Sequence, residues 1–261
     1  MLHTTESRQD KIVELLNEEL FVDIRTLTER LDVSVATVRR DLGDLEDAGR
    51  LRRTHGGAVA VNQVALDPAN ADRAISHLPE KKVIAEAAAA MIADGDTVLL
   101  DAGTTVLEVA KKLSGRMSGR TGLTFISNGA DIVAELTRED SNTVFSVGGE
   151  YAAINRSFRG PLAENFIRQF NVDKLILNAA SIDLDRGLIF TGSPVNASVQ
   201  QAMIEVSGQV IVVADHSKFT KSSFSVAAKL ADVGVVVTDA GAKSIIDTVP
   251  EKLRRKFVIA N

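Results

Sequence analysis

The chain has 261 residues, a formal net charge of -5 and no cysteine. Its 45% hydrophobic and 25% charged residues are ordinary for a globular protein. Its length allows one large core or a small domain plus a medium one, and it favours the second. The lack of cysteine excludes disulfide frameworks and thiolate metal sites. The first residues are charged and include no long apolar stretch, which indicates a cytoplasmic protein without a membrane segment.

Three short amphipathic helices are predicted within the first fifty residues. Apolar side chains recur at helical spacing over residues 8–20, 24–31 and 35–45. Ser34 is placed to cap the third helix, and Gly49 is placed to end it in a left-handed turn. On a helical wheel, the inward face of the third helix carries Val35, Val38, Leu42 and Leu45.

Basic residues concentrate on and after this third helix, with five arginines at positions 39, 40, 50, 52 and 53. The segment RLRRTHGGAVAV (50–61) alternates apolar and basic residues around a Gly-Gly pair, which is typical of a two-stranded wing. In a winged helix-turn-helix, the N-terminal half of the second helix of the motif enters the major groove of DNA. The pattern therefore predicts duplex DNA as a partner. The candidate DNA-binding residues are Ser34, Ala36, Thr37, Arg39, Arg40, Arg50, Arg52, Arg53 and His55.

Each of these side chains suits a different part of the duplex. Arg39 and Arg40 can reach guanine edges or phosphates, Thr37 can bond a phosphate, and Ala36 can meet a thymine methyl group. Residues 1–57 contain nine Lys or Arg and twelve Asp or Glu, so binding should depend on a local patch and on salt. The alternative is a helical hairpin whose arginines are merely solvated.

A linker is predicted over residues 61–80, between a domain at 1–60 and another at 81–261. This stretch has no sustained periodicity, and Pro68 and Pro79 are expected to interrupt helix and strand. Beyond it, apolar runs alternate with helical stretches, which favours an α/β domain with a mostly parallel sheet. The runs are 97–100, 125–127, 144–147, 174–177, 210–214 and 233–237.

The second candidate site is an anion site at the carboxyl edge of this sheet. The stretch VLLDAGTTVLEVAKKL (98–113) reads as strand, glycine turn and helix, and a helix N-terminus attracts phosphate. FISNGADIVAEL (125–136) and VFSVGGE (144–150) repeat the strand-to-turn pattern, although each alone could be an ordinary tight turn. The candidate residues are Gly103, Thr104, Thr105, Ser127, Asn128, Gly129, Gly148, Gly149 and, after a later strand, Lys218.

Histidines do not predict a metal site. His3, His55, His77 and His216 are scattered, and no pair has the short ligand spacing that zinc sites use. We therefore expect neither a metal nor a cofactor.

Both halves of the chain resemble the DeoR family of bacterial transcriptional regulators. In the first half the resemblance lies in Arg8, Ile12 and Leu16, in the run 34–42, and in Gly49, Arg53 and HGGA at 55–58. In the second half, DAGTT, the SNG turn, VGGE, RGPLAENFIRQFNVDK, AMIE and DHSKF are similar to the family's effector domain. The resemblance covers nearly the whole chain.

The resemblance implies a fold like that of pentose-phosphate isomerases and an effector that is a phosphorylated sugar or a related metabolite. It implies a nucleoid-associated repressor of carbohydrate-metabolism genes. Paired operator half-sites favour a homo-oligomer, a dimer or a tetramer. The effector contacts that it implies are Asp101, Gly103, Thr104, Thr105, Ser127, Asn128 and Lys218.

Two departures from the family pattern remove charge from the expected sugar end of the site. Residues 178–181 read Asn-Ala-Ala-Ser where the family usually shows Gly-Ala-Asp-Gly. Asn196 and Gln200 stand where the family tends to carry a glutamate and a lysine. An unusual effector or an altered site would follow.

Two other functions remain open at this point. A sugar-phosphate isomerase could use Asp101 and Lys218 for proton transfer, although the missing acidic residues disfavour it. The C-terminal domain could instead serve only for oligomerisation. No P-loop, dinucleotide fingerprint or nucleophile elbow occurs in the sequence.

Overall fold

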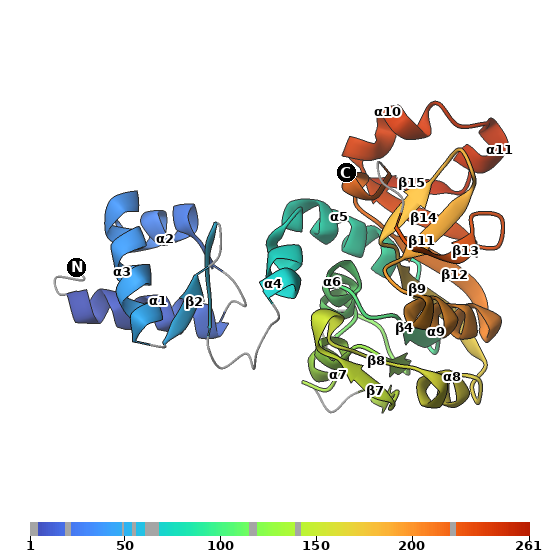
Figure 1. Cartoon of the computed structure of the whole chain (residues 1–261), viewed down its shortest axis with the longest axis horizontal. Helices are drawn as coiled ribbons and strands as arrows, with labels where there is room; N and C mark the ends of the chain where they lie inside the picture. The colour runs from blue at the N-terminus through green and yellow to red at the C-terminus, as the bar shows by residue number, and fades with distance from the viewer. Residues whose placement is uncertain are drawn as a thin grey trace. The chain divides into compact units, whose positions relative to one another are not determined.

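The computed structural model describes residues 5–18, 22–48, 50–53, 56–60, 68–114, 119–138, 142–219 and 223–261. The chain forms two compact units, Met1–Ser76 and His77–Asn261 (Figure 1). Among the described residues, no helix is both long and apolar enough to span a bilayer.

The N-terminal unit is a winged helix-turn-helix, as its periodicity predicts. Its helices are α1 (Thr5–Glu18), α2 (Ile24–Leu31) and α3 (Val35–Asp47), and its strands are β1 (Val22–Asp23), β2 (Leu51–Arg53) and β3 (Gly57–Ala60). The strands pair antiparallel in the order β1-β3-β2. A core from all three helices and the sheet holds the unit together, and it includes Ile12, Leu16, Leu27, Val38, Leu42, Leu45 and Leu51.

Side chains cap two of these helices. The Asp23 carboxylate accepts a hydrogen bond from the Thr26 amide at 2.8 Å, and the Ser34 hydroxyl accepts one from the Thr37 amide at 3.2 Å. The expected Ser34 cap is therefore confirmed, whereas Gly49 lies outside the described residues. The expected burial of Val35 is wrong, because this side chain is 44% exposed. Helical side chains lean toward the helix N-terminus, so Val35, as the first residue of α3, leans past its end.

Both prolines of the expected linker lie in the first turn of a helix. Helix α4 spans Pro68–Ile75 and α5 spans Leu78–Ala89, with Pro68 and Pro79 in their first turns. The expectation that these prolines interrupt helix is wrong, because the first turn leaves its amides without acceptors and a missing N–H costs nothing there.

The C-terminal unit is built on a seven-stranded parallel sheet, in the order β15-β14-β12-β9-β4-β5-β6. Six of its strands match the six apolar runs, and the seventh was missed. The strands are β4 (Thr97–Leu100), β5 (Thr124–Ser127), β6 (Thr143–Ser146), β9 (Val172–Asn178), β12 (Ser207–Val213), β14 (Val235–Asp239) and β15 (Phe257–Ala260).

Helices cover both faces of this sheet (Figure 1). Val98 and Leu100 face a core formed with α5, α6 (Thr104–Leu113) and α7 (Ala130–Leu136). Leu99, between them, faces the opposite core with α8 (Pro161–Ile167) and α9 (Pro194–Glu205). Burial on both faces explains why the central strands are almost continuously apolar, whereas β6, at the edge of the sheet, is mostly exposed.

Shorter elements complete this unit. Strands β10 (Ser181–Asp183), β11 (Leu188–Thr191) and β13 (Ser225–Lys229) form an antiparallel sheet, and β7 (Glu150–Ala152) pairs with β8 (Ser157–Arg159). The remaining elements are the 3-10 helices η2 (Ala153–Asn155), η3 (His216–Phe219) and η4 (Ala240–Ala242), and the short helices α10 (Lys243–Ile246) and α11 (Glu251–Arg254).

The strand order reverses between β4 and β9. Chain order runs outward from β4 through β5 to β6 on one side, and from β9 through β12 and β14 to β15 on the other. In open α/β sheets, ligands bind at the carboxyl ends of the strands where the order reverses. The segments after β4 and β9 are therefore the place to seek a ligand site.

Candidate nucleic-acid interface and effector site

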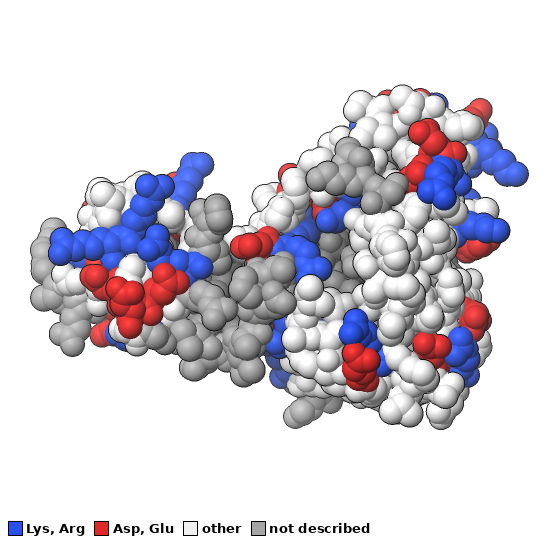
Figure 2. All heavy atoms as spheres, viewed as in Figure 1, with Lys and Arg blue, Asp and Glu red and all other residues white. Residues whose placement is uncertain are grey.

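Helix α3 presents an exposed face that carries two of the predicted arginines. Ala36, Arg39 and Arg40 are exposed, while the buried stripe runs along Val38, Leu42 and Leu45. Figure 2 shows a patch of Lys and Arg side chains beside a cluster of Asp and Glu on the visible face of the N-terminal unit. The helix therefore combines a buried side with a surface suited to an anionic partner.

A buried ion pair holds this helix against α1. The Arg8 guanidinium donates to both carboxylate oxygens of Asp41, at 2.5 and 2.8 Å, and Asp41 is only 1% exposed. The hydrogen bond to Asp41 raises the pKa of Arg8. Arg8, the first residue of the family pattern, thus supports the fold by holding α3 against α1.

The wing arginines have contacts within the unit. The Arg50 guanidinium donates to Asp10 at 2.8 Å, and the Arg53 amide donates to the Glu46 carboxylate at 2.8 Å. The Arg53 guanidinium lies beside Gly43, with Nη1 at an ordinary van der Waals distance of 3.7 Å from where a Cβ on Gly43 would stand. His55 and the side chain of Arg52 lie outside the described residues.

Asp101 follows β4 and is the centre of a hydrogen-bond network at the point where the strand order reverses. Its carboxylate accepts from the Ala102 amide at 2.8 Å, from the Asn178 amide at 3.3 Å and from the Gln200 side-chain amide at 2.6 Å. Burial raises the pKa of Asp101 to about 6, although these hydrogen bonds oppose the rise. All three of these donors are uncharged amides.

Asn178 and Gln200 were not predicted to meet Asp101. Gln200 is buried on α9 and also donates to the Asn178 carbonyl at 3.0 Å. Its Oε1 atom is buried and has no hydrogen-bond partner among the described residues. Both residues are positions where the chain departs from the family pattern, and that departure was the available signal.

Ser127 and Asn128 support the turn that follows β5. The Ser127 hydroxyl donates to the Leu100 carbonyl and accepts from the Gly129 amide, at 2.8 and 3.0 Å. The Asn128 side chain accepts from the Ala102 amide at 2.9 Å. Both side chains are buried, and their hydrogen bonds connect the turn after β5 to the end of β4.

Gly103 caps the N-terminus of α6 and lies next to this network. A Cβ on Gly103 would lie 2.7 Å from Cγ of Asn178, so the Asn178 side chain packs on Gly103 more closely than a side chain at position 103 permits. Thr104 and Thr105 follow in the first turn of α6, where the helix dipole favours an anion. The structure thus brings together Asp101, Gly103, Ser127, Asn128 and Gly129, with Asn178 and Gln200 added.

The other predicted effector residues lie elsewhere on the carboxyl edge. Gly149 packs on the turn before α8, because a Cβ there would stand 2.7 Å from the Arg159 carbonyl oxygen. Gly148 is exposed. Lys218 lies in η3, after β12, and no described contact joins it to the α6 N-terminus.

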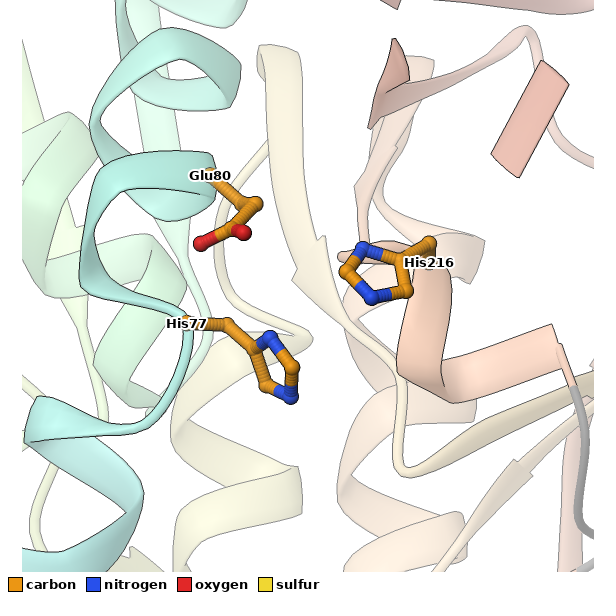
Figure 3. Close-up of side chains that lie close together, drawn as sticks. All are labelled: His77, Glu80 and His216. Atoms are coloured by element: carbon orange, nitrogen blue, oxygen red, sulfur yellow. The ribbon is translucent and has the colours of Figure 1, made fainter. Parts of the chain in front are cut away.

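Two of the histidines expected to be scattered come together in this unit. The rings of His77 and His216 meet edge to face, with centroids 4.9 Å apart, and Glu80 lies beside them (Figure 3). Sequence spacing could not show this, because His77 precedes α5 and His216 follows β12, far along the chain. Burial alone would raise the pKa of Asp239, but hydrogen bonds from the His216 amide and ring and from the Gly241 amide lower it.

A winged helix-turn-helix followed by a doubly wound α/β domain defines a DNA-binding protein with a separate second domain. Family models agree: a DeoR-like helix-turn-helix domain matches residues 8–64, and a DeoR C terminal sensor domain matches residues 76–240. The chain therefore belongs to the DeoR family, and it is a transcriptional repressor rather than an enzyme.

Relatives match the chain over most of its length. The transcriptional repressor AccR of Agrobacterium fabrum is 67% identical over 100% of both chains. The glycerol-3-phosphate regulon repressor of Haemophilus influenzae is 32% identical over 97% of this chain and 96% of its own. Among solved structures, ribose 5-phosphate isomerase A from Methanocaldococcus jannaschii is 15% identical, with a TM-score of 0.41 over 56% of each chain.

Proposed function

We propose that the protein represses carbohydrate-metabolism genes and that a phosphorylated sugar or related metabolite releases it from its operator. Helix α3 reads the operator through Ala36, Thr37, Arg39 and Arg40, while the wing holds the phosphate backbone. The observation that carries the DNA part is the exposed, basic outer face of α3, whose inner face is buried and whose N-terminus is capped.

The effector part of the proposal depends on the α6 N-terminus at Gly103. This helix end lies beside the reversal of strand order, and the glycine at its cap leaves the backbone amides uncovered by a side chain of its own. In this proposal Gly103, Thr104 and Thr105 bind the phosphate, Lys218 approaches it from η3, and Asp101, Ser127 and Asn128 hold the turns. One relative is itself named for the glycerol-3-phosphate regulon, and glycerol 3-phosphate is a compound of the proposed class.

The effector acts by binding one arrangement of the protein more tightly than the other. The test is a gel-shift titration of the DNA upstream of the gene with a panel of phosphorylated sugars and their unphosphorylated counterparts. Release by a phosphorylated compound alone is expected. Operator binding that none of the panel alters, with no thermal stabilisation at millimolar concentration, would favour a domain that only oligomerises.

Arg39→Ala and Arg40→Ala are each expected to weaken operator affinity by about 1–3 kcal/mol, because each removes a guanidinium from the exposed face of α3. If the lost contact is to a phosphate, the slope of affinity against salt should also fall by about one. Gel shifts at several salt concentrations measure both quantities. Arg255→Ala, which removes an exposed arginine of the other unit, is the matched control. Unchanged affinity in both α3 variants contradicts the proposed reading helix.

Gly103→Ala is expected to weaken the effector response while operator binding is retained. The added Cβ would stand 2.7 Å from Asn178 and must displace it or the start of α6. Overpacking of this kind costs about 1–3 kcal/mol, and a cost of that size borne by the effector-bound arrangement alone raises the effector concentration for release roughly 5- to 150-fold. Gly192→Ala is the control, since a Cβ there meets nothing within 4 Å. Equal release concentrations for the two variants would place the phosphate elsewhere.

A further inference from the structure

His77, Glu80 and His216 present three potential metal ligands to one another. One ligand atom from each residue lies within 4.8 Å of the other two, and all three side chains are partly exposed. In Figure 3 the two imidazole rings and the carboxylate lie around a common space. All three residues belong to the C-terminal unit, His77 and Glu80 from the start of α5 and His216 from η3.

The backbone at His77 is held in an unfavourable conformation. Its φ is +54°, in the left-handed region that residues other than glycine rarely adopt. It occupies the cap position of α5, yet its side chain makes no capping hydrogen bond. Such local strain persists where the surroundings enforce it, and it is commonly found at functional sites. A capping role therefore does not explain the left-handed backbone of His77.

His216 is oriented as metal-binding histidines usually are. Its Nδ1 lies 2.8 Å from Oδ2 of Asp239, and its amide donates to Oδ1 of the same carboxylate at 2.7 Å. A proton on Nδ1 shared with a carboxylate leaves the lone pair of Nε2 for a metal. A Cβ on Gly241 would stand 2.7 Å from Nδ1 of His216, so glycine is required for the ring to lie against Asp239.

We propose that His77, Glu80 and His216 bind a divalent transition-metal ion of the Zn²⁺ class. Two imidazole nitrogens and one carboxylate oxygen are a donor set that such ions use. At bond lengths of roughly 2.0–2.2 Å, tetrahedral ligand atoms are about 3.4 Å apart, so small rotations of these partly exposed side chains complete the geometry. Three protein ligands leave a coordination position for water or for an oxygen of a bound anion.

The ion would join two segments of the C-terminal unit that bear on the proposed response to the effector. His77 is the first residue after the N-terminal unit, which ends at Ser76. His216 lies in the same short 3-10 helix as Lys218. A bound ion therefore fastens the start of α5 to η3. The competing explanation is that the edge-to-face contact of the rings is simple packing, which needs no ion.

The test is a titration of tag-free, metal-stripped, full-length protein. Zn²⁺ binding is followed by calorimetry, and Co²⁺ binding is followed by the visible absorption of the coordinated ion. One ion per chain is expected. Glu80→Gln and His216→Gln are expected to weaken binding by at least about tenfold, and Asp239→Asn by about 10- to 100-fold, as loss of a supporting carboxylate does. His3→Gln, which removes a histidine from the N-terminal unit, is the control.

The Glu80→Gln variant keeps the test decisive if a histidine variant fails to fold, because Glu80 lies partly exposed in the first turn of α5. Circular dichroism of the metal-free variants checks folding. Stoichiometric binding that the cluster variants lose and His3→Gln retains supports the proposal. Absence of binding in the native chain, or binding that Glu80→Gln and His216→Gln leave unchanged, overturns it.

Discussion

Asp41→Ala is expected to lower the free energy of unfolding of the N-terminal unit by about 3–5 kcal/mol. The side chains of Arg8 and Asp41 are 14% and 2% exposed, so the substitution leaves a mostly buried guanidinium without its carboxylate. Removing one member of a buried pair costs more than the pair contributes, because the remaining charge stays desolvated. Amide hydrogen exchange of α1 and α3 in the full-length protein measures the effect, and protection should fall by about a hundredfold or more.

An exposed ion pair in the same unit provides the matched control. Asp10 and Arg50 also pair at 2.8 Å, but their side chains are 56% and 43% exposed. Asp10→Ala should therefore cost less than about 1 kcal/mol. The double variant Arg8→Met with Asp41→Leu should recover most of the lost stability, since it leaves no unpaired charge. A similar small loss for Asp41→Ala and Asp10→Ala would show that burial of the first pair is unimportant.

Local patterns predicted the elements of this protein well. Ser34 stands directly before an apolar stripe of period 3.6, and its cap follows from neighbouring residues alone. All six apolar runs became strands of one parallel sheet, and five of them are mostly buried because a strand covered on both faces needs no polar residue, whereas β6 lies at the exposed edge. The errors arose at element boundaries. A proline can stand in the first turn of a helix or just after a helix ends, and Pro68 and Pro79 stand in first turns.

Contacts between distant residues could not be predicted in the same way. Arg8 and Asp41 are 33 residues apart, and Gln200 and Asp101 are 99 apart. Only the packing of α1 on α3, or of α9 beside β4 and β9, brings such partners together. The same holds for His77 and His216, whose meeting depends on how α5 packs against the sheet. The individual DNA and effector contacts remain predictions, because they involve partners that are not part of the chain.

Asp101→Asn is expected to stabilise the C-terminal unit at neutral pH, because burial raises the pKa of Asp101 from 3.8 to about 6. A raised pKa means that the folded state favours the protonated carboxyl, so stability is lost as pH rises from 3.8 through about 6. Above that range the native carboxylate costs up to about 3 kcal/mol, at about 1.4 kcal/mol for each pH unit. Asparagine removes this cost, and its amide can donate to the buried Oε1 of Gln200 if the two amides reorient.

Thermal unfolding of the full-length variant and native proteins from about pH 4 to about pH 8 measures this difference. The advantage of Asp101→Asn should grow with pH, while effector release weakens because the turn before α6 loses its carboxylate. Asp96→Asn is the control of opposite sign: burial alone would raise the pKa of Asp96, but hydrogen bonds from Ala93 and Lys174 lower it. Its loss of stability should therefore be largest at neutral pH and vanish in acid. If Asp101→Asn destabilises the protein at neutral pH, as Asp96→Asn is expected to do, then the Asp101 carboxylate is a net source of stability, and the turn before α6 depends on its charge.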